Sequence, residues 1–493
     1  MRLDRILKDS GCHLEGRHGA VEVSSICCDS RKVSYGSLFV AIKGFASDGH
    51  DYIATAIGKG ARVIVFEDQQ AYERQTASLD MEGVIAVQTE SSRHAMAIIA
   101  ANFYDNPSHK LTLVGITGTN GKTTTVTLLH RMFTAMGYSC GLLSTIANYV
   151  GTKGTEAVNT TSDPLTINSL LAQMVEAGCE YCFMEVSSIG VEQSRVEGLK
   201  FKAGIFSNLT HDHLDYHKTF ANYLSCKKRF FDNLPSSAFA LVNADDRNGM
   251  VMVQNTKAGI YRYACRSNAD FKTKIIERSI EGMLLKINSK EVWCRFIGDY
   301  NAANLTAVYA AATLLGADED ETIRIMSELT SVAGRLEYFK GMNNVIAAVD
   351  YAHTPDALEN VLKTLIELKP EGGVTCVFGC GGNRDKTKRP EMGAIAGKYA
   401  ERVIVTSDNP RNEDPYEIIK DIKSGMDLKM KAKSLFISDR EEAIRTAILT
   451  ANPGSIILVA GKGHEDYQII NGVKHHFDDK EIILETFAGQ TEQ

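Results

Sequence analysis

Residues 111–124 have the sequence LTLVGITGTNGKTT, in which an apolar run meets a glycine-rich turn. The run 111–117 is rich in Leu, Val, Ile and Thr, which predicts a buried β-strand. The segment after the turn, TTVTLLHRMFTAMG, predicts a helix. A strand, a glycine-rich turn and a helix in this order are the context in which many proteins bind nucleotide phosphates. The segment therefore predicts an α/β domain with a phosphate-binding turn.

In such a turn, glycines let backbone N–H groups approach phosphate oxygens, and the helix N-terminus adds a favourable dipole. Lys122 can reach the β- and γ-phosphates, and Thr123 can ligate Mg²⁺. The turn departs from the strict P-loop pattern, because Ile116 stands where a glycine is required. The alternative is a glycine-rich turn with a chance Lys-Thr pair, but the context favours ATP binding. The residues expected at ATP are Gly118, Thr119, Asn120, Gly121, Lys122, Thr123 and Thr124.

Similar strand–loop–helix units recur along the chain. CFMEVSS (182–188) and AGIFSNLT (203–210) predict strands that end in polar loops. Strands alternating with helices predict a doubly wound parallel sheet, whose ligands bind beyond the carboxyl ends of the strands. We expect an α/β protein of three domains: 1–108, 109–334 with the phosphate-binding turn, and 335–493 with a second, Rossmann-like sheet.

Charge and cysteine usage exclude several classes of protein. The net charge is −7, whereas nucleic-acid and anionic-membrane binders are usually basic, so we expect neither partner. The first residues lack the apolar core of a signal peptide, and no apolar run approaches a membrane span. Eleven cysteines without framework spacing indicate reduced thiols and a cytoplasmic location. The single C-x-x-C, Cys179 to Cys182, is expected in the core.

Further motifs follow the glycine-rich turn in a fixed order. They are TTSDP (160–164), MEVSS (184–188), SNLTHDHLDYH (207–217), GDYNAAN (298–304), GRLE (334–337) and DYAHTPD (350–356). Together with GTNGKTT they resemble the Mur ligase family over nearly the whole chain. The resemblance implies a UDP-sugar-binding N-terminal domain, a central ATP-binding domain and a C-terminal domain that brings the amino acid.

Four motifs narrow the resemblance within the family: DSR (29–31), CGGNRDK (380–386), DNPR (408–411) and GKGHEDY (461–467). They are similar to those of members that add meso-diaminopimelate to a UDP-N-acetylmuramoyl dipeptide. The resemblance implies a monomeric, ATP- and Mg²⁺-dependent ligase of cytoplasmic peptidoglycan precursor synthesis. ATP would phosphorylate a carboxylate to an acyl phosphate, and an amine would then displace phosphate, so the site needs a phosphate cradle and cations.

A carboxylate, a histidine cluster and a lysine are candidates for the catalytic centre beside Lys122. Glu185 ends an apolar strand, where it suits Mg²⁺, although it could instead be a capping or ion-paired side chain. The histidines of 211–217, taken alone, could form a zinc site or a solvated loop. The resemblance implies that His213 ligates Mg²⁺, and that Lys227 is carbamylated by CO₂ so that its carbamate faces the metal. The alternative for the run KKR (227–229) is a solvated helix face.

The resemblance also distributes the substrate-binding residues. For the UDP substrate they are Ser30, Thr160, Thr161, Ser187, Gln193 and Arg195, with 45–47 as a less specific uridine loop. For the adenosine side they are Asn301, Asn304, Asp350 and His353. For diaminopimelate they are Arg384, Asp408, Asn409, Pro410, Arg411, Gly461 and Glu465.

The residue types in the last group fit diaminopimelate, which carries a far carboxylate and ammonium. Arg411 can hold that carboxylate in a two-pronged pair, which lysine as a substrate could not use. Glu465 can pair with the ammonium. The alternatives are that RDKTKR (384–389) is a solvated basic loop and that DNPR is only a turn.

Three other functions stay open at this stage. A lysine-adding or folate-glutamylating ligase of the same superfamily is one, although Arg411 argues against both. A P-loop switch that hydrolyses ATP without ligation is another. A zinc hydrolase that uses the histidine cluster is the third.

Overall fold

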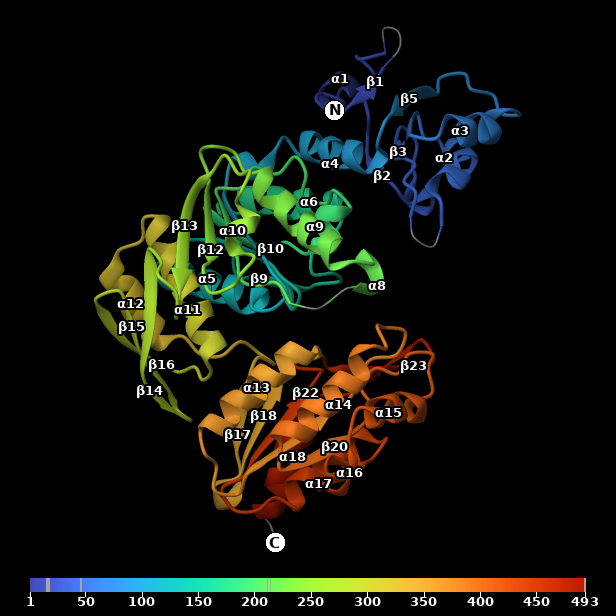
Figure 1. The fold of residues 1–493 in the computed structure, drawn as a ribbon. Helices are drawn as coiled ribbons and strands as arrows, with labels where there is room; N and C mark the ends of the chain where they lie inside the picture. The colour runs from blue at the N-terminus through green and yellow to red at the C-terminus, as the bar shows by residue number, and fades with distance from the viewer. Residues whose placement is uncertain (15–17, 45–46, 211, 213, 492–493) are drawn as a thin grey trace.

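The computed structural model describes residues 1–14, 18–44, 47–210, 212 and 214–491. Within them, three large sheets follow one another along the chain, each in its own domain, from the N-terminal domain at the top of Figure 1 to the C-terminal domain at the bottom. The two termini lie at opposite ends of an elongated molecule. His211, His213 and residues 45–46 lie outside the described residues.

The N-terminal domain is built on a five-stranded sheet. Its elements are α1 (Leu3–Ile6), β1 (Cys12–His13), β2 (Ile26–Cys27), η1 (Ser30–Lys32), β3 (Leu38–Val40), η2 (Gly49–Tyr52), α2 (Ile53–Gly58), β4 (Val63–Phe66), α3 (Gln69–Thr76), β5 (Ile85–Thr89), α4 (Ser92–Phe103) and η3 (Pro107–His109). The strand order is β1-β5-β4-β3-β2, and all pairs but β1–β5 are parallel. Successive residues of β4 enter apolar clusters on opposite faces, so the sheet is buried on both sides.

The central domain holds an eleven-stranded sheet. Its elements are β6 (Thr112–Thr117), α5 (Lys122–Ala135), β7 (Cys140–Leu143), β8 (Ala147–Val150), β9 (Lys153–Glu156), α6 (Pro164–Glu176), β10 (Tyr181–Glu185), α7 (Ser188–Glu192), β11 (Ala203–Phe206), α8 (Leu214–His217), α9 (Phe220–Asp232), β12 (Phe239–Asn243), α10 (Gly249–Met252), β13 (Gly259–Ala264), β14 (Phe271–Ser279), β15 (Gly282–Ile287), β16 (Lys290–Cys294), α11 (Asp299–Leu314) and α12 (Glu319–Glu328). The order is β16-β15-β14-β13-β12-β11-β6-β10-β7-β8-β9.

The middle of this sheet, from β14 to β7 in that order, is parallel. Helices α5, α11 and α12 cover one face, and α6 and α9 cover the other, each through a separate apolar cluster. The prediction of a doubly wound parallel sheet is confirmed here. Cys182 is fully buried in β10 and Cys179 just before it, so core packing of the C-x-x-C is confirmed as well.

Both edges of the central sheet are antiparallel, which the sequence did not predict. β8 and β9 extend one edge as a hairpin, and β15 and β16 extend the other. Every residue of β9, Lys153–Glu156, is exposed. A strand that buries no side chain has no apolar alternation to reveal it.

The C-terminal domain has a six-stranded sheet and a separate hairpin. Its elements are β17 (Glu337–Lys340), η4 (Met342–Asn344), β18 (Ile346–Asp350), α13 (Pro355–Glu367), β19 (Val374–Phe378), α14 (Lys388–Tyr399), β20 (Arg402–Val405), α15 (Pro415–Ser424), α16 (Leu428–Ala432), β21 (Ser434–Phe436), α17 (Arg440–Leu449), β22 (Ile456–Ala460), β23 (Tyr467–Ile470), β24 (Val473–His476) and α18 (Asp479–Thr491). The order is β17-β18-β22-β19-β20-β21, parallel except for β17.

An ion pair is buried in the core of this domain. The Arg440 Nε and Nη2 atoms donate to the two carboxylate oxygens of Asp479 at 2.8 and 2.7 Å, and both side chains are 0% exposed. Arg440 also donates to the carbonyl oxygens of Ala460 at 3.0 Å and Ser407 at 3.4 Å. The pair therefore ties α17 and α18 to the carboxyl ends of β20 and β22.

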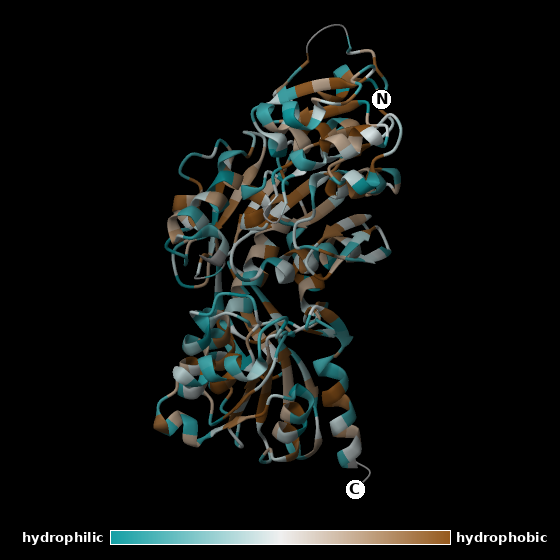
Figure 2. Ribbon diagram, turned by 90° about the vertical axis from the view of Figure 1, so that its right-hand side faces the viewer, coloured by the Kyte–Doolittle hydropathy of each residue, from teal (hydrophilic) through white to brown (hydrophobic). Residues whose placement is uncertain are grey.

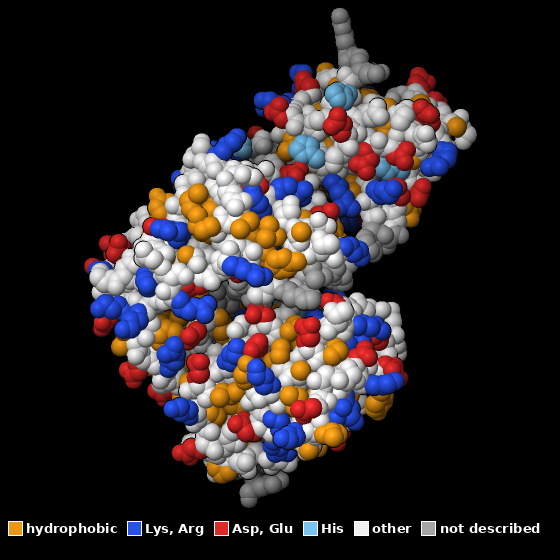
Figure 3. Space-filling model, in the orientation of Figure 1, with side chains coloured by type: hydrophobic (Ala, Val, Ile, Leu, Met, Phe, Trp, Pro, Cys, Tyr) orange, Lys and Arg blue, Asp and Glu red, His pale blue; other side chains and the backbone are white. Residues whose placement is uncertain are grey.

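Polar and apolar residues are distributed according to the layers of the fold. Figure 2 shows hydrophobic residues concentrated along the strands, with hydrophilic residues on the outer helix faces and loops. Lysine and arginine side chains are interspersed with acidic ones over the face in Figure 3. Among the described residues, no helix combines the length and apolar character needed to cross a membrane.

Candidate active site

The phosphate-binding turn connects β6 to α5 through two backbone conformations that favour glycine. The φ angles are +152° at Gly118 and +87° at Gly121. A Cβ at Gly118 would lie 1.9 Å from Ser207 Oγ, and one at Gly121 would lie 2.5 Å from Asn304 Oδ1. Close approach therefore requires glycine at both positions. The first N–H groups of α5, which have no acceptor within the helix, begin directly after the turn.

Two lysine amines meet at this turn, one half-buried and one fully buried. The Lys122 Nζ donates to the carbonyl oxygens of Gly118 at 2.9 Å and Thr119 at 2.7 Å. The Lys227 Nζ donates to the same Gly118 oxygen at 2.9 Å, and its side chain is 1% exposed, so residue 227 does not belong to a solvated helix face. Burial lowers the pKa of Lys122. Burial and the neighbouring Lys122 charge together lower the pKa of Lys227 well below its usual value.

Oxygen ligands lie beside the two lysines. The fully buried Glu185 carboxylate, at the end of β10, accepts from the Thr145 backbone N–H at 2.8 Å and from its hydroxyl at 3.2 Å. Thr123, the second residue of α5, brings a hydroxyl to the other end of the turn. Carboxylate and hydroxyl oxygens are the hard ligands that Mg²⁺ prefers, so the donor set fits Mg²⁺ bound together with nucleotide phosphates. In the part of the chain that the structure describes, no group of three or more His, Cys, Asp or Glu is arranged around a metal position.

A cavity of about 440 Å³ lies between the central and C-terminal domains. Gly121, Asn304 and Asn301 line it from the central domain, and Asp350 and His353 line it from the C-terminal domain. Its volume is in the range of small-molecule sites. The Asn301 side chain donates to the Ile297 carbonyl at 2.9 Å, which holds the start of α11.

The side chains of Asp350 and His353 also form hydrogen bonds with nearby backbone groups. The Asp350 carboxylate accepts from the backbone N–H groups of Leu336 at 2.8 Å and Ala352 at 2.7 Å, which anchors the chain where it enters the C-terminal domain. Burial raises the pKa of Asp350 to about 6. His353 Nδ1 lies 2.8 Å from the Tyr351 carbonyl oxygen, and burial lowers the pKa of His353 to about 4. The imidazole is therefore neutral at pH 7, with Nδ1 donating to the carbonyl and Nε2 able to accept.

Sequence reasoning did not select Arg335, which connects the two domains. Its guanidinium lies over the Tyr351 ring, 4.5 Å from the centroid, and donates to the Thr123 hydroxyl at 3.2 Å. A second contact crosses the same boundary, because Asn120 Nδ2 donates to Asp356 Oδ2 at 3.2 Å. The signal for Arg335 was its position in GRLE, at the predicted domain boundary.

Most residues predicted for the UDP substrate lie together beside Glu185. The Thr161 hydroxyl donates to the Glu185 carbonyl oxygen at 2.9 Å and accepts from the Ser187 N–H at 2.9 Å. Arg195 donates to the Thr161 carbonyl at 2.6 Å and to the Gln193 side chain at 2.7 Å. These bonds join the loop before α6 to the segment that follows β10. Thr160 joins this group, its hydroxyl accepting from that of Thr145.

Ser30 lies in the N-terminal domain, at the first residue of η1. Its backbone carbonyl accepts from Lys59 at 3.1 Å. Burial raises the pKa of neighbouring Cys28, and the charge of Asp163 adds to the increase. Because Asp163 caps α6 of the central domain, the Ser30 loop faces that domain.

The loops after β20 and β22 bring together most of the residues predicted to bind the amino-acid substrate. Asn409 Nδ2 donates to the Glu465 carboxylate at 2.8 Å. Burial, together with the charge of Asp408, raises the pKa of Glu465. The Lys462 amine is fully buried between these groups, 3.6 Å from Asp408 and 3.9 Å from Glu465, and sequence reasoning did not select it. Gly461, at φ +116°, connects β22 to this cluster.

Two arginines lie around Gly381 at the edge of the same cluster, since a Cβ built at Gly381 would lie 2.9 Å from Arg411 Nη1 and 3.6 Å from Arg384 Cγ. Arg411, after Pro410, has a φ of +53°, held by hydrogen bonds from its N–H to the Ile469 carbonyl at 2.9 Å and from the Asn471 N–H to its carbonyl at 2.6 Å. Burial lowers the pKa of Arg411, and the charge of Arg384 adds to the decrease. Arg384 itself is exposed. Two neighbouring guanidinium groups form a site that suits a carboxylate.

Comparison with known proteins places these motifs in one family. Models described as "Mur ligase family, catalytic domain", "Mur ligase middle domain" and "Mur ligase, glutamate ligase domain" match residues 22–104, 116–312 and 334–463. Proteins of Parabacteroides distasonis and Cytophaga hutchinsonii named UDP-N-acetylmuramoyl-L-alanyl-D-glutamate–2,6-diaminopimelate ligase are 52% and 50% identical to this chain. The first alignment covers 95% of this chain and 96% of the relative, and the second covers 98% of each. A solved structure with the same printed name is 29% identical, with a TM-score of 0.69 over 100% of both chains.

Proposed function

The chain belongs to the Mur ligase family, and we propose that it joins meso-2,6-diaminopimelate to UDP-N-acetylmuramoyl-L-alanyl-D-glutamate while ATP becomes ADP and phosphate. Full-length relatives of about 50% identity carry that name. The observation that carries the proposal is the arginine pair beside a buried acidic cluster. Because the substrates are ATP and a nucleotide-linked precursor, we place the reaction in the cytoplasm.

The reaction has two chemical steps. A glutamate carboxylate oxygen attacks the γ-phosphorus of ATP, the bond to ADP breaks, and an acyl phosphate forms. An amine of diaminopimelate then attacks the acyl carbon, loses a proton, and displaces inorganic phosphate from the tetrahedral intermediate. Catalysis by the protein therefore consists of holding the reactants and neutralising charge.

The phosphate-binding turn supplies the cradle for these steps. Backbone N–H groups at the start of α5 face the phosphates, and Lys122 exchanges its bonds to the turn carbonyls for phosphate oxygens. Glu185 and the Thr123 hydroxyl would hold Mg²⁺, with His213 as a further ligand. Mg²⁺, when bound, neutralises charge on the phosphates.

Lys227 is proposed to act as a carbamate. Its low pKa favours the neutral amine that reacts with CO₂, and the nearby positive charge of Lys122 favours the negatively charged product. The modification would place a negative charge beside the positive charge of Lys122. It would also add a carboxylate-like group beside Glu185 and the metal.

The amino-acid pocket accounts for the choice of substrate. Arg411 and Arg384 would bind the far carboxylate of diaminopimelate, and Asp408 and Glu465 would bind its far ammonium. Lysine lacks the carboxylate, so the guanidinium groups would stay unpaired. Asn409 helps to orient Glu465, since it donates to its carboxylate.

The UDP substrate is proposed to reach Glu185 from the N-terminal domain. Ser30 would contact the nucleotide-sugar end, while Thr161, Ser187 and Arg195 would hold the peptide near the phosphate-binding turn. Thr160 and Gln193 lie in the same group of loops. Asn304, Asp350 and His353 would contact adenosine across the cavity.

A phosphate-release assay tests the proposal. The purified chain is given ATP, Mg²⁺ and the UDP-linked dipeptide, with diaminopimelate, lysine or ornithine as the amino acid. We expect phosphate release only when the dipeptide and diaminopimelate are both present. Equal rates without an amino acid would indicate a nucleotide hydrolase, and a preference for lysine would indicate a sister ligase.

A further inference from the structure

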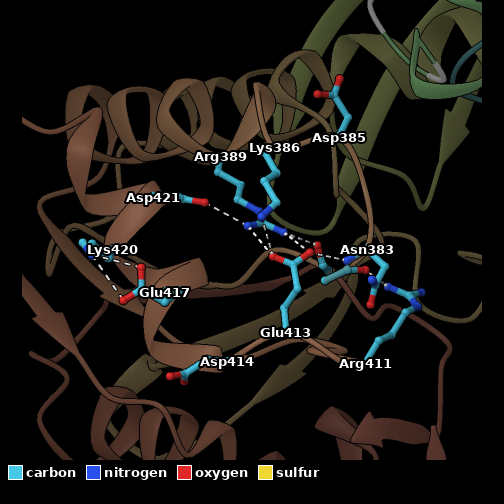
Figure 4. A network of polar contacts seen from close by, with 12 residues as sticks. Asn383, Asp385, Lys386, Arg389, Arg411, Glu413, Asp414, Glu417, Lys420 and Asp421 are labelled. Atoms are coloured by element: carbon cyan, nitrogen blue, oxygen red, sulfur yellow. Dashed lines mark hydrogen bonds and ion pairs between the residues drawn. The ribbon is translucent and has the colours of Figure 1, made fainter. Parts of the chain in front are cut away.

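Arg389 ends the basic run RDKTKR, yet its side chain is among the most deeply buried in the protein, at 1% exposed. Its Nη1 donates to Glu413 at 3.0 Å and to Asp421 at 2.9 Å. Its Nη2 donates to the other Glu413 oxygen at 3.1 Å and to the Gly381 carbonyl at 3.2 Å. One guanidinium therefore binds two carboxylates and a backbone carbonyl, as Figure 4 shows for the side-chain contacts.

These contacts connect the two loops that carry the arginine pair. Glu413, two residues after Arg411, accepts from the backbone N–H of Asn383, one residue before Arg384. The Asn383 side chain in turn accepts from the Asn412 N–H at 3.2 Å. In Figure 4, Glu413 lies between Arg389 and Asn383, with Arg411 beyond, whereas Asp421 lies on the opposite side of Arg389.

The arginine pair itself adds to this connection. Arg411 Nη1 donates to the Gly382 carbonyl at 2.9 Å, and the Gly382 N–H donates to the Asn409 carbonyl at 2.9 Å. A Cβ at Gly382 would lie 1.9 Å from the Pro410 carbonyl oxygen, so the loops touch at backbone level.

Positive charge is held close together here without a substrate. This small region contains four cationic side chains: Arg384, Lys386, Arg389 and Arg411. Like charges that lie close together repel. Glu413 opposes this repulsion, since its hydrogen bonds with Arg389 lower its pKa to about 2 and keep it ionised at working pH. The exposed Lys386 also pairs with it, at 3.2 Å.

We propose that Arg389 and Glu413 are positioning residues that hold Arg384 and Arg411 side by side for the far carboxylate of the amino-acid substrate. They touch no substrate themselves. Arg389 fixes Glu413 and the Gly381 carbonyl, and Glu413 fixes the loop that carries Arg384. The inference rests on the proposed function, because it assumes that this carboxylate binds to the arginine pair.

The test compares two matched substitutions around Arg389. Glu413→Gln removes the charge that joins the two loops, whereas Asp421→Asn makes the same chemical change on the side of Arg389 away from them. We expect Glu413→Gln to raise the KM for diaminopimelate roughly tenfold or more, with the KM for ATP and the UDP-dipeptide unchanged. Asp421→Asn should change none of the three by more than about twofold. Equal effects of the two variants, or an equal rise for every substrate, would overturn the inference.

A double-mutant cycle separates positioning from general loss of structure. In the Arg411→Ala background, Glu413→Gln should add much less than its effect in the wild type, because the arginine pair that Glu413 holds together is already broken. Full additivity would show that Glu413 acts elsewhere. If Glu413→Gln does not fold, Arg389→Lys, which keeps the charge but loses the fork of donors, enters the same cycle.

The two hypotheses fail in different ways. If Arg411→Ala leaves the KM for diaminopimelate unchanged, the pocket assignment is wrong and the positioning role falls with it. If Arg411→Ala raises that KM but neither Glu413→Gln nor Arg389→Lys does, the proposed function stands and the positioning role alone is refuted.

Discussion

Replacing Asp479 by asparagine should destabilise the C-terminal domain, because it leaves the charge of Arg440 buried and unpaired. The carboxylate accepts both hydrogen bonds of the Arg440 fork, at 2.8 and 2.7 Å, and no part of either side chain is exposed. Removing one partner of such a pair costs about 3–5 kcal/mol. The two bonds from Arg440 to backbone carbonyls remain, which favours the lower end of that range.

Hydrogen exchange measures the loss where it occurs, which matters because a chain of three domains need not unfold in one step. Backbone amides of β20 and β22 should exchange faster in Asp479→Asn, by roughly a thousandfold for about 4 kcal/mol, while those of β6 and β10 keep their wild-type rates. Glu417→Gln is the matched control. It breaks the exposed pair with Lys420, at 3.0 Å, and should cost less than about 0.5 kcal/mol.

A double variant completes the test. Arg440→Met combined with Asp479→Leu removes both charges and should recover most of the stability lost in the single variant. A loss below about 1 kcal/mol in Asp479→Asn would refute the reasoning, since it would mean that the buried guanidinium finds another partner. Equal losses in β6 and in β20 would mean that the domains unfold together.

Three further predictions concern the candidate site. Lys122→Ala should lower kcat by two to three orders of magnitude with an unchanged circular dichroism spectrum; near-normal ligation would remove the turn from the mechanism. Lys227→Arg, which keeps a cation but cannot form a carbamate, should be nearly inactive, whereas the wild type should lose activity when CO₂ is removed and regain it with bicarbonate. The pKa of His353 is lowered to about 4, below the usual 6.5, so the stability that it contributes is present above pH 6.5 and falls by up to about 3 kcal/mol as the pH drops to 4. His353→Asn, whose amide can keep the bond to the Tyr351 carbonyl, should reduce that dependence in thermal melts; an identical pH profile would contradict the assignment.

The parts of the fold that the sequence predicted are those with strong local patterns. The run before Gly118 is both apolar and β-branched, and the strands ending at Glu185 and Phe206 share that composition. Polar residues after such strands meet at one edge of a parallel sheet, so topology predicted that Glu185 and Ser187 would lie near the phosphate-binding turn, whereas Thr161 was expected there only from the resemblance. The antiparallel edges carry no such pattern, because exposed strands such as β9 need no apolar face.

The residues that sequence reasoning missed have roles that depend on tertiary contacts. Arg389 belongs to a charged run typical of a solvated loop, and only the folding of α14 against α15 buries it. Lys462 lies in a glycine-rich motif, but its proximity to Asp408 requires β20 and β22 to end at the same edge of the sheet. Arg335 meets Thr123 across a domain boundary, 212 positions away in the sequence.

The cavity proposed to bind ATP has walls from two domains, and this has a consequence for inhibition. A compound shaped to the wall around Gly121 and Asn304 alone would use only part of the available surface, and its affinity would depend little on how the domains are spaced. A compound that also reaches Asp350 and His353 would contact both walls, and its length would decide its effect on the domains. A short one would hold the two walls together and retain product, and a longer one would keep them apart and prevent assembly of the site. Ligand length, rather than surface complementarity alone, would then decide which step of the catalytic cycle is blocked.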